Sequence, residues 1–270
     1  EVLDGNPVNG NGRSFVSWNW VANGGTTASS TNSTVQVNST ANFSIVQYNG
    51  TGSDQNIGHG LGVKPDTIWV KNLVENSATG SGVSWRVWQK DVISLSGDPN
   101  SYIRFNSDDS HTAGGDSWGD TAPTSSVFTV GADVHTNAAV SGGTATYIAY
   151  CFANVEGYSR TGKYVGNGNS NGPFVYTGLK PALVIIKGYN IGNNWICWDN
   201  KRSLINPCDN VIYADLTQAE TTSGNDLDFL SNGFKCRGTN SNYNGSYTYI
   251  YWAFAEHPFL GNGTNPVTGR

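Results

Sequence analysis

The sequence predicts an all-β protein with two tandem, duplicated β-sandwich domains of jelly-roll or lectin-like type. Short runs rich in Val, Ile, Tyr, Phe and Trp alternate with clusters of Gly, Asn, Ser and Thr, as in strands separated by turns. No long stretch keeps the apolar spacing of a helix, so helix is a minority structure. Finally, a set of strand-like blocks occurs twice in the same order, which indicates two copies of one unit.

The repeated blocks locate the strands of the two copies. KPDTIWVK (64–71) returns as KPALVIIK (180–187), WRVW (85–88) as WICW (195–198), and TYIAYCFA (146–153) as TYIYWAFA (248–255). The distance between equivalent blocks shortens along the chain, which is expected when loops change and the core stays the same. Each copy is long enough to form a domain with its own core.

Three segments follow from this pattern. Residues 1–42 hold one predicted strand (14–21) and a Gly/Ser/Thr/Asn linker (23–34). The first sandwich repeat covers 43–157 and opens with FSIVQY (43–48), whose alternation suits a half-buried strand. The second repeat covers 158–270, with its first strand at 162–165. The join at 154–161 has no flexible run, so we expect a fixed angle between the repeats.

The charge pattern argues against several partners. The net charge is −5, and the fifteen Lys and Arg residues form no basic stripe, which speaks against nucleic acid. No apolar stretch is long enough to insert in a membrane. No motif predicts a cofactor or a metal site. The chain contains no Met, from which we expect a longer protein whose N-terminal part is missing here.

The four cysteines lack zinc-site spacing. Cys151 stands where the second copy has Ala253, so a free, buried thiol is expected there. Cys197, Cys208 and Cys236 all lie in the second repeat. Cys197 and Cys236 fall on predicted strands and form the better candidate pair for a disulfide, although spacing alone leaves the pairing open.

Two polar loops are candidate ligand sites. A sugar site needs a flat aromatic face with Asn, Asp or backbone groups beside it. Such a set occurs in the first copy as Asp116, Trp118 and Asp120, and in the second as Asn242 and Tyr243. The alternative is that each ring folds back over the edge of its domain or lies in a subunit contact.

Catalytic residues are not apparent, and we predict no enzyme activity. Asp226 and Asp228 alternate across Leu227 and would share one strand face, as a polysaccharide-cleaving pair could. Acidic residues in a turn-rich chain more often form turns or solvate the surface.

Several blocks resemble a known family. The chain is similar, from about residue 14 onward, to the C-terminal region of tail-fibre and other fibre-like virion proteins of marine bacteriophages, including cyanophages. The similarity is carried by FSIV (43–46), GHGLG (58–62), YIAYCFA (147–153), GPFVYTG (172–178), WDNKR (198–202), LDFLSNGFK (227–235) and YIY (249–251).

The resemblance implies a structural, receptor-facing protein of the virion surface. It implies a homotrimer joined to other virion proteins through the missing N-terminal part, and it assigns no site residues. We therefore expect a tail-fibre-like protein that contacts a host-surface polysaccharide or protein receptor. A structural, decoration or surface-filament protein without a receptor is the first alternative, and a polysaccharide depolymerase is the second.

Overall fold

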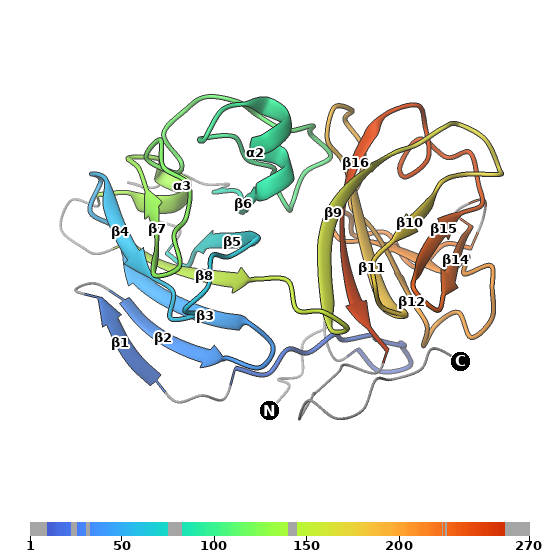
Figure 1. The fold of residues 1–270 in the computed structure, drawn as a ribbon, viewed down its shortest axis with the longest axis horizontal. Helices are drawn as coiled ribbons and strands as arrows, with labels where there is room; N and C mark the ends of the chain where they lie inside the picture. Colours follow the sequence, from blue (N-terminus) through green and yellow to red (C-terminus); the bar gives the residue numbers. More distant parts are fainter. Residues whose placement is uncertain are drawn as a thin grey trace.

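The computed structural model describes residues 10–22, 26–30, 33–74, 83–139, 145–222, 224 and 226–256, and it is almost entirely β (Figure 1). The prediction of an all-β sandwich fold is confirmed. Strand runs rich in β-branched and aromatic residues form antiparallel sheets, and the described helices are short, α2 (Lys90–Ser96) and α3 (Val134–Asn137). No helix in the described ranges is long and apolar enough to cross a membrane.

The first unit is a two-layer sandwich. Its large sheet has the order β1–β2–β3–β8–β5–β6, and its small sheet pairs β4 with β7. The bounds are β1 (Thr26–Ser30), β2 (Ser33–Asn38), β3 (Phe43–Asn49), β4 (Gln55–Gly58), β5 (Thr67–Asn72), β6 (Arg86–Gln89), β7 (Val127–Val130) and β8 (Thr146–Phe152). Val46, Val70 and Ala149 of the large sheet meet Ile57 and Phe128 of the small sheet in one buried core.

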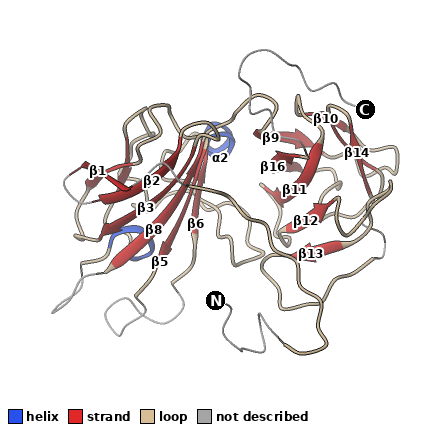
Figure 2. Ribbon diagram, turned by 90° about the horizontal axis from the view of Figure 1, so that it is seen from below, coloured by secondary structure: helices blue, strands red, loops and turns tan. Residues whose placement is uncertain are grey.

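The second unit also has one large sheet and one small sheet. Its large sheet has the order β13–β12–β11–β16–β9, and its small sheet the order β10–β15–β14 (Figure 2). The bounds are β9 (Ser159–Val165), β10 (Phe174–Tyr176), β11 (Pro181–Gly188), β12 (Ile196–Asp199), β13 (Val211–Tyr213), β14 (Leu227–Leu230), β15 (Gly233–Cys236) and β16 (Thr248–Ala255). The pairing order β9–β16–β11–β12 matches β3–β8–β5–β6 of the first unit. This is the order expected from the sequence repeat, and the duplication itself remains a prediction.

The outer faces of the two large sheets form a third core, between the units. Successive side chains of a strand point to opposite faces. On β16, Tyr249 and Tyr251 therefore enter the core of the second sandwich, whereas Ile250, Trp252 and Phe254 face the first unit. Trp252 packs against Trp69 of the first unit with ring centroids 6.0 Å apart. This apolar contact holds the two units together, as the short join suggested.

The first 42 residues differ from the prediction in two ways. Residues 14–21 pair with no strand and run extended along the lower side of both units in Figure 1. The predicted linker instead contributes β1 and part of β2, and β2 pairs with β3 along its length. In β2 the buried side chains of Ser33 and Val35 alternate with exposed Thr34 and Gln36. A Ser/Thr-rich composition here therefore accompanies a half-buried strand rather than a linker.

Candidate functional site

The predicted ligand residues of the first loop do not form a sugar-binding face. Trp118 is 1% exposed, and its ring packs in the core of the first sandwich. Asp116 accepts a hydrogen bond from the Ala132 amide at 2.7 Å, and Asp120 accepts one from Asn100 Nδ2 at 2.7 Å. The prediction is wrong here because the Trp118 ring is buried in the core, where its packing is stabilising, and is not presented on the loop surface.

The second loop is built in the same way. Tyr243 is fully buried, with its ring edge-on to Trp198 at 5.2 Å and its hydroxyl donating to the Asp226 carbonyl at 3.1 Å. Burial raises the pKa of this hydroxyl above its usual value. The backbone carbonyl of Asn242 accepts from Asn193 Nδ2 at 2.9 Å. Asn242 and Tyr243 therefore hold the loop in place, and the prediction of a ligand site at this ring is also wrong.

The four cysteines are free and buried, so the predicted Cys197–Cys236 disulfide is wrong. Cys197 lies on the face of β12 that meets the first unit, whereas Cys236 lies in the core of the second sandwich. Burial raises the pKa of both thiols to about 12. Cys151 is a buried, free thiol in the core of the first sandwich, as expected from its alignment with Ala253.

The two acidic residues of the candidate pair have separate partners. Asp228 forms an ion pair with Arg237, with Oδ2 and Nε 3.1 Å apart. The backbone carbonyl of Asp226 accepts hydrogen bonds from Arg237 N and from the Tyr243 hydroxyl. No group of three or more His, Cys, Asp or Glu side chains in the described part of the chain could hold a metal ion.

An extended N-terminal segment contributes to a cavity at the junction of the units. We call residues 13–22 the strap. Trp20 wedges between the units, with its ring 6.0 Å from Phe152 and 5.1 Å from Phe254. The far end of the strap is held by a 2.9 Å hydrogen bond from Asn38 Nδ2 to the Val21 carbonyl. The strap is therefore fixed by side chains rather than by sheet pairing.

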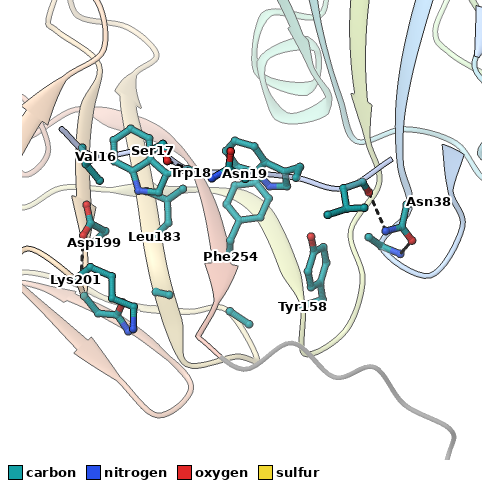
Figure 3. A pocket seen from close by; sticks show the side chains of 16 residues that line it. Val16, Ser17, Trp18, Asn19, Asn38, Tyr158, Leu183, Asp199, Lys201 and Phe254 are labelled. Atoms are coloured by element: carbon teal, nitrogen blue, oxygen red, sulfur yellow. Dashed lines mark hydrogen bonds between the residues drawn. The ribbon is translucent and has the colours of Figure 1, made fainter. Parts of the chain in front are cut away.

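The strap and the second unit enclose a cavity of about 540 Å³, which we call the strap cleft (Figure 3). Its walls are residues 16–21 of the strap together with Tyr158, Leu183 and Phe254. Polar residues line it as well, at the turn that follows β12: Asp199, Asn200 and Lys201. A volume of this size lies within the range of small-molecule sites.

The charges of that turn are largely paired. The Asp199 carboxylate accepts from Arg202 Nε at 2.6 Å and from the Lys201 and Arg202 amides, both at 3.0 Å. Arg202 also lies 6.0 Å from the Trp18 ring, at the distance of a cation–π contact. Lys201 is exposed beside this pair. The turn therefore places the Lys201 amine and polar groups held by backbone hydrogen bonds in the same cleft as the rings of Trp18 and Trp20.

Two polar atoms in the walls of the strap cleft are buried without a hydrogen-bond partner. They are Nε1 of Trp18, a donor, and Oδ1 of Asn200, an acceptor. Buried polar groups are nearly always paired, so these two atoms are exceptions among the residues that line the cleft.

Sequence reasoning missed this site. The sequence predicts a strand over Trp18 and Trp20, and Asp199 belongs only to a block that carries the family resemblance. The signal that could have revealed them is the pair of tryptophans outside both repeats, since neither repeat needs them for its sandwich core.

The fold and the cleft define a two-unit β-sandwich protein with an aromatic and polar cavity at the junction of the units. The chain belongs to the family described as a domain of unknown function, DUF7483, whose model matches residues 1–258. No curated protein and no solved structure matches the chain.

Proposed function

We propose that this chain is a tail-fibre-like structural protein of a virion surface that binds a host-surface glycan in the strap cleft. The observation that carries the proposal is the combination, in one cavity, of the Trp18 and Trp20 rings with the polar turn at Asn200 and Lys201. The resemblance to fibre-like virion proteins of marine bacteriophages supports the same reading.

A glycan suits the chemistry of the cleft. A pyranose ring has an apolar C–H face that packs against an indole and a rim of hydroxyl groups. Those hydroxyl groups can pair with the polar side chains that line the cleft, and the exposed Lys201 amine can donate to a hydroxyl or a carboxylate. The cleft lies at a junction of two units, where ligand sites occur preferentially.

The proposed role is structural and non-enzymatic. The core between the units is rich in Trp, Phe and Tyr, and a rigid body of this kind suits a fibre that must hold its shape at the particle surface. A homotrimer, joined to other virion proteins through an additional N-terminal region, is the assembly that the family resemblance implies. The depolymerase alternative has no observation in its favour, since Asp228 is engaged with Arg237.

The test is binding of the purified chain to an array of bacterial surface polysaccharides. Wild type is compared with Trp18→Ala and, as a matched control, with Leu204→Ala, whose side chain is 83% exposed outside the cleft. Loss of one aromatic contact is expected to weaken binding about tenfold or more, and the control should bind as wild type. A folded wild-type chain that binds no saccharide overturns the glycan-binding part, and a monomer in light scattering contradicts the trimer.

A further inference from the structure

A second cavity adjoins the strap cleft on the first unit. It has a volume of about 290 Å³, and its lining includes Trp20, Ile45, Trp69, Trp85, Phe105 and Tyr150. We call it the aromatic groove. Trp20 lines both cavities, so the strap cleft and the aromatic groove have one wall residue in common.

The groove arises because side chains along each strand of the first unit point alternately to the two faces of the sheet. Ile45 of β3, Trp69 of β5 and Tyr150 of β8 all point away from the first sandwich core, toward the second unit. The second unit covers this face only in part, so Ile45 and Tyr150 stay half-buried while Trp69 is 8% exposed. The floor of the groove is therefore the part of the first unit's large sheet that the second unit leaves uncovered.

The rings of the groove are arranged as flat faces. Trp85 and Tyr150 lie nearly parallel, with centroids 6.1 Å apart and an interplanar angle of 24°. Trp69 and Phe105 are also stacked, at 5.0 Å and 28°. A stacked ring has one face against its partner, so Trp85 and Tyr150, the more exposed pair, offer their outer faces and edges to a ligand.

The polar groups of the groove are few and uncharged. The indole N–H of Trp85 and the hydroxyl of Tyr150 make no hydrogen bond to any residue in the described part of the chain. No charged side chain lines the groove among those residues. A ligand there must therefore be neutral, with one apolar face and a few hydroxyl groups at its edge.

We infer that the aromatic groove is a second subsite for the same glycan chain, and that it takes a neutral pyranose ring on the Trp85 and Tyr150 faces while the preceding sugars occupy the strap cleft. This inference rests on the proposed function and adds that the ligand is an oligosaccharide long enough to pass Trp20. A single sugar would fill one cavity and leave the other empty.

The experiment uses a polysaccharide that binds on the array, cut into fragments of increasing length. Affinities for wild type, Trp85→Ala and Tyr150→Phe are measured by calorimetry, with thermal unfolding as the check that each variant is folded. For wild type, affinity should rise about tenfold once the fragment is long enough to enter the groove. Trp85→Ala should remove this rise and leave the affinity for short fragments unchanged. Tyr150→Phe keeps the ring and should reduce the rise only in part.

The outcomes separate the two proposals. If Trp85→Ala binds every fragment as wild type does, or weakens short and long fragments equally, the second subsite is wrong while glycan binding in the cleft stands. If Trp18→Ala leaves all binding unchanged, the glycan does not occupy the strap cleft. If no fragment binds to the folded wild type, both proposals fall.

Discussion

Lys187 of β11 lies at the contact between the two units, and its effect on the free energy of unfolding can be measured as a function of pH. It is fully buried, and its Nζ donates to the Asp108 carbonyl of the first unit at 2.9 Å. The same amine donates to the backbone carbonyl of Asn193 and, at 3.4 Å, to Asn193 Oδ1. Burial is the main influence on this group and lowers its pKa from 10.5 to about 8, although Asp215 and neighbouring carboxylates favour the charged form.

The perturbation is Lys187→Met, which keeps the length of the side chain and removes the proton-binding group. In wild type the folded pKa lies below the unfolded one, so the unfolded chain binds more protons between about pH 8 and pH 10.5. The free energy of unfolding therefore rises with pH across this window. The gap of about 2.5 pH units corresponds to about 3 kcal/mol, and below about pH 8 the full cost of the buried ammonium remains.

The assay is urea denaturation of both proteins at about pH 7.5 and about pH 10, followed by tryptophan fluorescence. Cysteines and tyrosines titrate alike in both proteins, so their effects cancel in the difference. That difference should move in favour of wild type by about 2 to 3 kcal/mol at the higher pH. A difference that stays constant to within about 0.5 kcal/mol would refute the assigned environment of Lys187.

Three further predictions concern the buried aromatic and thiol groups. Trp252→Ala removes a fully buried ring between the units and should lower the free energy of unfolding by about 3 to 5 kcal/mol, measured in urea; a loss below about 1 kcal/mol contradicts this packing. Trp118→Ala should be destabilising by a similar amount, yet leave glycan binding of the folded fraction intact, and a stable variant that binds no glycan would restore the original site prediction. A thiol reagent should label no cysteine of the native chain at neutral pH and all four after denaturation, and rapid labelling of Cys197 or Cys236 in the native chain would contradict their burial.

Local pattern predicted most of the repeated strand blocks well. In 248–255 every other residue enters the sandwich core, and the intervening residues are also apolar, which indicates a strand buried on both faces. The alignment of Cys151 with Ala253 likewise predicted a buried, free thiol, which the structure has. These features depend on neighbours along the chain and on a side-chain period of two, both of which can be read from the sequence.

Long-range packing decided where the aromatic rings of the loops and the strap lie. Trp118 and Tyr243 lie in polar loops, and nothing in those loops tells whether a ring points to solvent or back into the sandwich. The strap failed as a predicted strand for a related reason. Its residues alternate as in a strand, but a strand also needs an edge to pair with. The Trp20 ring packs at the junction of the units instead.

The sequence by itself determined the all-β class and the blocks that form β5, β6, β8, β11, β12 and β16. Only the tertiary structure decided that the outer faces of the two large sheets meet, that Trp20 lies between Phe152 and Phe254, and that a cleft opens beside Asn200. The physical reason is distance along the chain. Period-two patterning tells which side of a strand is apolar, but the residues that cover that side come from segments more than a hundred positions away, and their arrival depends on the path of the whole chain.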